Sequence, residues 1–446
     1  MRWTMGLGLV ALLGLGIGAA RAGTPAATYS TLGNGVTLIV SEQRSVPAVM
    51  VQVTLDAGAR RDPAGKEGVA HLAAELLTEG TARRSASEIS DAIDFLGASL
   101  ESAADADMVT VSLAVLRKDL DAGLDLLADV LLHPAFAEAE LTRRREAVLA
   151  GIRAQEDQPG AVAGKAFQRA LFGSEPYGHP DEGTLHSVPK ITRADVVAFY
   201  RRHYRPRQAL VTAVGDVATA EIQAKLEAVL GSWDGGPAAA FDYPAPQPVA
   251  TSPVLIDKPL TQANIILGHR GVARDNPDYY ALTVMNYILG GGGFSSRLLD
   301  NIRTRSGLAY SVGSMFSVNK AAGSFQVVMQ TKNASAHDAI ARAREEIDRI
   351  RREPVTDDEI TEAKLYLTGS FPLRLDSNRK ITGFLSQVEF YGLGRDYAET
   401  YPQRINAVTK EEVLRVAQLY LKPEQLLLVV VGNLSEISLS SAAQAP

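Results

Sequence analysis

The sequence predicts an α+β fold made of two copies of one unit, each a mainly antiparallel sheet packed with helices. Both halves alternate short strand-like stretches with amphipathic helical ones. A segment rich in proline, glycine and alanine, Asp234 to Pro253, separates halves of similar length. Pro206 and Pro423 lie 217 positions apart, and Gly215 and Gly432 have the same separation. A helix, a short proline turn, a strand and a glycine thus recur without a gap, which indicates an internal duplication.

In the first half, alternating apolar residues predict the strands and helical spacing predicts the helices. Asn34-Gly35 is a typical hairpin turn within Tyr29 to Val40. Further strands are expected at Ala48–Leu55, Met108–Leu116 and Ala209–Val214. Helices are expected at Val69–Glu79, Ser87–Gly97 with Ser87 as its cap, Leu120–Leu132, Ala137–Gln155, Val162–Leu171 and Arg193–His203. The strand Met108–Leu116 is either an exposed edge able to pair with an extended peptide or a covered core strand.

The second half repeats this layout. Strands are expected near Val254–Leu255, Ala263–Leu267, Tyr310–Val318 and Ser324–Thr331. Helices are expected near Tyr279–Leu289, Ser335–Arg352, Asp357–Gly369, Ile381–Tyr391 and Lys410–Tyr420. The predicted organisation is therefore a first domain over residues 23–233, a linker over 234–253 and a second domain over 254–446.

The first 22 residues have the features of a secretory signal peptide. A short basic start is followed by an apolar run and by Ala20-Arg21-Ala22, a typical cleavage site. A membrane anchor is the alternative. No later stretch approaches the length of a membrane span, so we expect a mature chain without a membrane partner. The chain has no cysteine, which excludes disulfides, thiol catalysis and lipidation of a cysteine at the cleavage site. A bacterial periplasm is the expected location.

The charge balance bears on the class of partner. Removal of residues 1–22 leaves 43 basic and 51 acidic residues. This acidic balance gives no reason to expect nucleic acid or an anionic membrane as a partner.

The stretch from Gly290 to Ser314 carries the candidate site. Four glycines, Gly290 to Gly293, allow close approach to another backbone, and a helix is expected to follow from Ser295 or Ser296 to Ser306. Arg303 then lies at the end of the helix and Tyr310 at the start of a strand, so both side chains could face one space. Arginine offers a fork of donors, and tyrosine can donate to a carbonyl or a developing oxyanion. The pair suits a peptide backbone, whereas a purely structural loop is the alternative. A phosphate loop is disfavoured, because no GK[ST] follows the glycines.

Residues 67–81, EGVAHLAAELLTEGT, point to a family. They resemble the zinc helix of the pitrilysin and insulysin family of inverzincin metallopeptidases, which includes the mitochondrial processing peptidases. In its H-x-x-E-H motif two histidines bind zinc and the glutamate activates water. The resemblance covers nearly the whole mature chain, including the GLAYSV strand, the FSSRL turn and the QEDQP loop after the charged helix. It implies two duplicated domains with the fold of mitochondrial processing peptidases.

The catalytic positions of that family are mostly absent. His71 keeps the first zinc ligand, but Ala74 replaces the general base and Glu75 the second histidine. Gly151 occupies the place of the third ligand. A methyl group cannot take a proton from water, and glycine offers no ligand. His71 and Glu75 could touch one ion, with Glu146 or Glu156 nearby in sequence, but two weak ligands make a poor zinc site. We therefore expect no metal in this chain. The other candidate histidines, His179, His186 and His203, are interpreted as surface or capping residues.

Arg303 and Tyr310, in contrast, match the family's R-x6-Y pair, which in relatives holds the substrate backbone and the attacked carbonyl. The resemblance implies a non-catalytic subunit of a two-chain enzyme. Its partner in the heterodimer is a homologous subunit that carries the zinc motif and the zinc, and its substrates are peptides. Two such chains closing face to face would enclose a chamber, and Gly291 and Gly292 are expected at its rim or wall, in contact with substrate.

Two other functions remain open. The chain could be a peptide-binding or structural scaffold subunit without a role in proteolysis. It could also be an autonomous metalloenzyme that uses His71, Glu75 and an unforeseen ligand.

Overall fold

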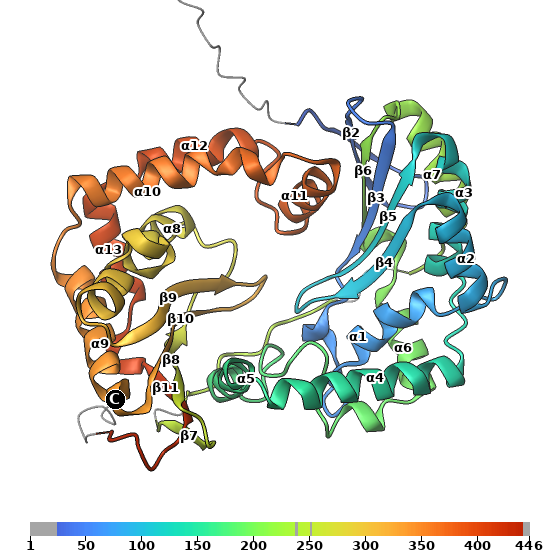
Figure 1. The fold of residues 1–446 in the computed structure, drawn as a ribbon. Coiled ribbons are helices and arrows are strands. Elements are labelled where there is room, and N and C mark those ends of the chain that lie inside the picture. Colours follow the sequence, from blue (N-terminus) through green and yellow to red (C-terminus); the bar gives the residue numbers. More distant parts are fainter. Residues whose placement is uncertain (1–24, 237–239, 250–251, 440–446) are drawn as a thin grey trace, which may run out of the picture.

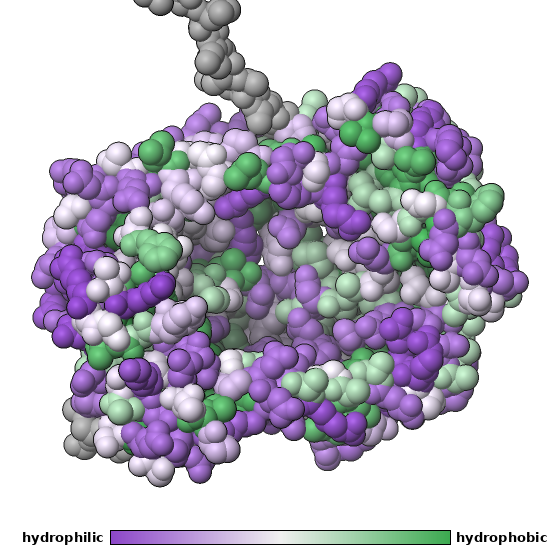
Figure 2. Space-filling view, viewed as in Figure 1, coloured by the Kyte–Doolittle hydropathy of each residue, from purple (hydrophilic) through white to green (hydrophobic). Residues whose placement is uncertain are grey.

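The molecule consists of two halves that face each other across a central space. The computed structural model describes residues 25–236, 240–249 and 252–439. Helices α5 (Pro159–Phe172) and α11 (Asn378–Phe390) lie between the two halves (Figure 1). The surface is hollowed between the halves (Figure 2). The predicted signal peptide, residues 1–22, lies outside the described residues.

The first half contains a six-stranded sheet in the order β1-β2-β6-β3-β5-β4. Its neighbouring strands pair antiparallel, except that β2 and β6 are parallel. The hairpin expected around Asn34-Gly35 is confirmed as the β1–β2 pair. The strands are β1 Thr28–Thr31, β2 Thr37–Glu42, β3 Ala48–Leu55, β4 Ser99–Ala104, β5 Val109–Leu116 and β6 Ala209–Gly215.

The second half contains a five-stranded sheet in the order β7-β11-β8-β10-β9. Here too a single parallel pair, β7 with β11, accompanies antiparallel pairs. The order matches that of the first sheet from β2 to β4, so the predicted duplication and the α+β class are confirmed. The strands are β7 Val254–Asp257, β8 Gln262–Arg270, β9 Ala309–Val318, β10 Gly323–Lys332 and β11 Leu427–Gly432.

Helices cover the outer face of each sheet (Figure 1). The helices of the first half, apart from α5, are α1 Val69–Glu75, α2 Ala86–Leu96, α3 Leu120–Leu132, α4 Glu138–Glu156, α6 Arg193–His203 and α7 Thr219–Leu230. The helices of the second half, apart from α11, are α8 Tyr279–Asn286, α9 Ala336–Arg352, α10 Asp357–Gly369, α12 Tyr397–Ala407 and α13 Lys410–Tyr420. The cap predicted for α2 was wrong, because Ser85 forms the capping box with Glu88 and Ser87 lies inside the helix.

One helix of each half packs on the sheet of the other half. Helix α5 of the first half packs on β8 and β11, and its Phe167 is buried with Ile266 and Val429 of the second sheet. Helix α11 of the second half packs on β3 and β6, where the Ser386 hydroxyl donates to Thr212 Oγ1 over 2.9 Å. This reciprocal packing buries apolar area between the halves and fixes their relative orientation.

The strand Met108–Leu116 is not an edge, so of its two alternatives the covered strand is the correct one. β5 lies between β3 and β4. β4 is an edge strand of the first sheet and β9 of the second, and both lie toward the central space (Figure 1). Strand β4, SLESAA, was missed because it is short and half of its residues are polar, as is common at a sheet edge.

The described part of the segment predicted as a linker is tied to the first half. The Phe241 ring lies 4.4 Å from the guanidinium of Arg60, and the Tyr243 hydroxyl donates to Glu175 over 2.9 Å. Within residues 25–439, apart from the two short undescribed gaps, no helix combines the length and apolar character needed to cross a membrane.

Candidate functional site

The four glycines span the end of a helix and the tight turn that follows it, and the end of the helix packs against β9. Helix α8 continues as a π-helical segment over Tyr287–Gly291, which then enters the turn. A Cβ on Gly290 would lie 2.4 Å from the Ser314 backbone nitrogen, so only glycine fits at this position. Gly293 has φ +58°, which also favours glycine. The predicted close approach of the glycines to another backbone is confirmed. Of the two glycines predicted to contact substrate, Gly291 is exposed and Gly292 is partly buried.

The helix that follows places Arg303 at its end, as predicted. Ser296 precedes it, and its last seven residues, Leu299–Arg305, adopt the wider π form. Ile302 is fully buried and anchors the last turn, while the backbone NH of Gly307 donates to Arg303 O over 3.0 Å and ends it. π-Helical segments are rare and often accompany functional sites.

A bulge at the start of β9 turns Tyr310 outward. Ser311 pairs with Gln330 and Ala309 pairs with Thr331, so Tyr310 has no partner residue on β10. Such bulges re-aim a side chain at a sheet edge. The Tyr310 side chain is accordingly 70% exposed.

Arg303 and Tyr310 do face one space, together with a third residue that the sequence analysis missed. The Arg303 guanidinium carbon lies 5.8 Å from the centroid of the Tyr310 ring and 5.3 Å from that of the Phe294 ring. Phe294 is 78% exposed. Rings at these distances attract the cation and restrict its movement. Within the described residues no carboxylate pairs with Arg303. Its donors therefore remain available to a ligand.

The turn is also held from behind by α10. The Ser295 hydroxyl contacts the carboxylate of Glu362, and the Tyr287 ring lies 5.0 Å from that of Tyr366. Arg297 is 8% exposed and forms two hydrogen bonds with Glu359, of 2.6 and 2.8 Å. A bidentate pair of this kind orients the base of the helix, so the exposed part of the site rests on fixed supports.

The degenerate zinc positions do not fit a zinc ion. The Nε2 atom of His71 lies 3.5 Å from a carboxylate oxygen of Glu75 on α1, as in a simple side-chain pair one helical turn apart. Gly151 on α4 adds no side chain. Among the described residues, no group of three or more histidine and acidic side chains is placed to hold a metal. Zinc needs at least three protein ligands at a catalytic site, and these residues cannot supply them.

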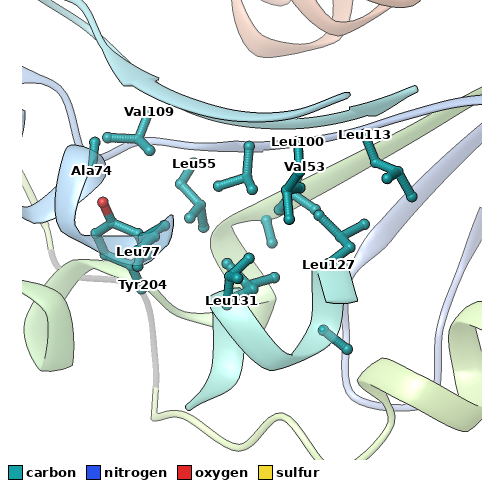
Figure 3. Packing of buried hydrophobic residues seen from close by; sticks show 14 of the residues in the cluster. Val53, Leu55, Ala74, Leu77, Leu100, Val109, Leu113, Leu127, Leu131 and Tyr204 are labelled. Carbon is teal, nitrogen blue, oxygen red and sulfur yellow. The ribbon is translucent and has the colours of Figure 1, made fainter. Parts of the chain in front are cut away.

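Ala74, at the position of the general base, belongs to the hydrophobic core. It is fully buried, and Figure 3 shows it beside Val109 and on the side of the Tyr204 hydroxyl. That hydroxyl is buried and has no hydrogen-bond partner within the described residues. No group at this position can activate water.

The three other candidate histidines differ in exposure. His203 is 5% exposed and packs 4.6 Å from the Phe199 ring, so its interpretation as a surface residue was wrong. Its spacing from Phe199 on α6 is the signal that could have placed it in the core. Burial and the nearby charge of Arg61 lower the pKa of His203 to about 4. His186 is exposed, and His179 is partly buried at a cavity described below.

The duplicated fold, the incomplete zinc helix and the exposed Arg303 and Tyr310 define the class: a two-domain protein built like a metallopeptidase. Two family models match it, described as insulinase (peptidase family M16) at residues 38–184 and as peptidase M16 inactive domain at residues 190–367. An uncharacterized zinc protease of Streptomyces coelicolor is 30% identical over 400 residues, covering 87% of this chain and 86% of that protein. The chain therefore belongs to peptidase family M16, and the predicted family is confirmed.

Solved structures agree with this assignment. The crystal structure of a peptidase M16 inactive domain from Pseudomonas fluorescens has a TM-score of 0.86 and 30% identity, covering 91% of this chain and 98% of that chain. A protease from Helicobacter pylori shares the fold with a TM-score of 0.82 at 21% identity, covering 92% of this chain and 100% of that chain. None of the seven histidines in the sequence begins an H-x-x-E-H motif. The chain is a family member that lacks the catalytic motif.

Proposed function

We propose that this chain is the non-catalytic subunit of a heterodimeric periplasmic zinc peptidase. Arg303 and Tyr310 hold the peptide and stabilise the attacked carbonyl, while a homologous partner subunit with an intact H-x-x-E-H motif supplies the zinc and its water. The observation that carries the proposal is the Arg303 guanidinium, which lies between two exposed rings and pairs with no carboxylate of the described residues.

The chemistry of peptide hydrolysis supports this division of labour. Attack on a carbonyl builds negative charge on its oxygen, and donors already aimed at that oxygen lower the barrier. Tyr310 is exposed and its hydroxyl can donate, and Arg303 carries donors in a planar fork that can also bind a peptide carbonyl. Neither side chain can generate a nucleophile, so the proposed reaction requires a second chain.

The arrangement of the halves is consistent with a peptide substrate. β9 is an edge strand that borders the central space, and Tyr310 lies at its start (Figure 1). Edge strands offer free backbone donors and acceptors to an extended chain. The surface between the halves is hollowed (Figure 2), and an unfolded peptide enters a hollow more readily than a folded protein does.

Reconstitution tests the proposal. The natural partner is sought as a co-purifying homologue that contains H-x-x-E-H, and peptide hydrolysis is then measured with and without this chain. We expect hydrolysis to require both chains and Arg303→Ala to reduce it at least tenfold. Arg305→Ala is the matched control, because Arg305 lies on the same helix but is 75% exposed and paired with Asp300.

The same experiment distinguishes the proposed function from that of a scaffold subunit without a role in proteolysis. If the zinc-bearing homologue binds this chain but cleaves peptides equally well without it, the chain is a scaffold and the catalytic role of Arg303 is wrong.

A further inference from the structure

A cavity of about 590 Å³ lies in the first half, away from the glycine turn. It is bounded by the end of α4, by one side of α5 and by the loop over residues 178–186. Its volume is within the range of about 300–1,000 Å³ typical of sites for small ligands. The loop is fixed to the segment before α1, since the Ser187 hydroxyl donates to Glu67 O over 2.8 Å. The cavity is therefore a preformed feature of the fold.

Part of the cavity wall is apolar. Ile152 from α4, Val162 from α5 and Leu185 from the loop all line it. Ile152 is 5% exposed and continues into the hydrophobic core, whereas Leu185 is 37% exposed at the surface. An aliphatic side chain of a ligand would lose water contact against these three residues, which favours binding.

Three cations also line the cavity: Lys165, Arg169 and Lys190. Lys165 and Arg169 are one turn apart on α5, and Lys165 is paired with Glu182 over 2.9 Å. Lys190 Nζ lies 2.5 Å from His186 Nε2. Arg169 forms no side-chain hydrogen bond or ion pair within the described residues. Arg169 is therefore the cation best placed to bind an incoming carboxylate, because the planar fork of arginine matches that group.

Acceptors for a positive group lie in the same cavity. Glu67 and Glu156 line it, and the carboxylate of Glu156 pairs with no cation of the described residues. His179 Nδ1 lies 3.0 Å from Pro180 O and must donate to that carbonyl, which leaves Nε2 as an acceptor. Burial lowers the pKa of His179, so this imidazole is neutral at neutral pH. The cavity thus offers groups for both charges in addition to its apolar wall.

We propose that this cavity binds a short peptide with free ends. The terminal carboxylate binds at Arg169 and Lys190, the terminal ammonium binds at Glu156, and apolar side chains lie against Ile152, Val162 and Leu185. A simple anion would leave Glu156 without a partner, and an uncharged ligand would leave both Glu156 and Arg169 without one. Short peptides are also the products of proteolysis, but the site does not depend on Arg303 and Tyr310 and stands apart from the proposed peptidase function.

Calorimetric titration of the full chain tests this site. The probe is trileucine with free ends, compared with its N-acetyl form and its C-terminal amide. We expect the free peptide to bind and each blocked form to bind at least tenfold more weakly. Arg169→Gln should weaken binding of the free peptide at least tenfold without further weakening binding of the amide. Glu156→Gln should weaken binding of the free peptide at least tenfold without further weakening binding of the N-acetyl form. Val162→Trp, which fills the cavity without changing charge, should abolish binding.

The control variant is Arg153→Gln, because Arg153 is an exposed cation on α4 that does not line the cavity. Its binding should equal that of the unmodified chain, and thermal melting checks that each variant is folded. Equal binding of the amide and the free peptide, unchanged binding by Arg169→Gln, or absence of binding at millimolar peptide would overturn the proposal. Displacement of the peptide by equimolar inorganic phosphate would also overturn it, since that result indicates a general anion site.

Discussion

Asp107 joins the two halves, and its replacement by asparagine should destabilise the whole molecule. Its carboxylate is 1% exposed and accepts hydrogen bonds from the Tyr177 hydroxyl (2.5 Å), the Lys320 backbone NH (2.8 Å) and the Tyr391 hydroxyl (3.1 Å). Arg60 forms an ion pair with it over 3.0 Å. Burial and the charge of Asp107 raise the pKa of both tyrosines, so each keeps its proton and donates. Lys320 and Tyr391 belong to the second half, so the carboxylate bridges the halves.

The expected magnitude follows from these contacts. Removal of one partner of a buried ion pair typically costs about 3–5 kcal/mol, because the other charge stays buried. Arg60 retains Asp56 as a second partner, which places Asp107→Asn near the lower end of that range. The asparagine amide also turns one acceptor into a donor, which faces the donors that Asp107 had satisfied. A loss of about 3 kcal/mol corresponds to a fall of roughly 6–12 °C in the melting temperature for a unit of about 200 residues.

Thermal melting of the two variants Asp107→Asn and Asp376→Asn checks this prediction. Asp376 is paired with Lys380 at the surface, where its side chain is 46% exposed, and such pairs contribute about 0–1 kcal/mol. If Asp107→Asn lowers the melting temperature no more than Asp376→Asn does, the bridge between the halves does not have the role argued for it.

Three further predictions concern the glycine turn, a buried acid and the exposed ring beside the candidate site. Gly290→Ala should lower the free energy of unfolding, measured in urea, by about 3 kcal/mol, because its Cβ would meet backbone atoms. Gly293→Ala should lower it by only about 1 kcal/mol, through its positive φ alone. Equal losses for the two variants would contradict the packing argument. Burial and neighbouring acids raise the pKa of Asp181 to about 7. The folded state therefore keeps this proton at pH values where the unfolded state has lost it, and the free energy of unfolding falls as pH rises from about 4 to about 7. Asp181→Asn should therefore raise the free energy of unfolding by about 1–3 kcal/mol at about pH 8 and by less at about pH 5, and the opposite pH trend would refute the assignment. Phe294→Ala removes one ring beside the Arg303 guanidinium and should raise the KM of the reconstituted enzyme roughly two- to fivefold. Phe95→Ala is the control, because this ring is also exposed and its removal should leave the KM unchanged.

Much of the fold could be predicted from the sequence, because buried strands and amphipathic helices have strong periodicity. β6 and β11 are fully buried runs, and their repetition at a constant separation revealed the duplication. Helix α7 carried a usable signal that was missed, since Ile222, Leu226 and Leu230 recur at helical spacing. Helix α12 was harder to predict, because Pro402 interrupts its pattern.

The candidate site was only partly predictable. Arg303 and Tyr310 stand near in the sequence, so the local order of helix and strand was enough to bring them together. The exposure of Phe294 depends on how the glycine turn packs, and a single apolar residue does not reveal this. Asp107 could not be identified, because its partners are 70, 213 and 284 positions away. Contacts of that kind are set by the tertiary fold and leave no local pattern.

The central claim is that Tyr310 acts on a reaction catalysed by another chain. It is tested most directly by the kcat of the reconstituted heterodimer at saturating peptide, with Tyr310→Phe in this chain and Tyr366→Phe as the control. The change removes only a hydroxyl group, and loss of one donor to a developing oxyanion typically costs about 10²–10³ in kcat. We predict a fall of about a hundredfold for Tyr310→Phe, with unchanged affinity between the two chains and an unchanged kcat for Tyr366→Phe. A kcat for Tyr310→Phe within about twofold of that of the unmodified complex would contradict the account.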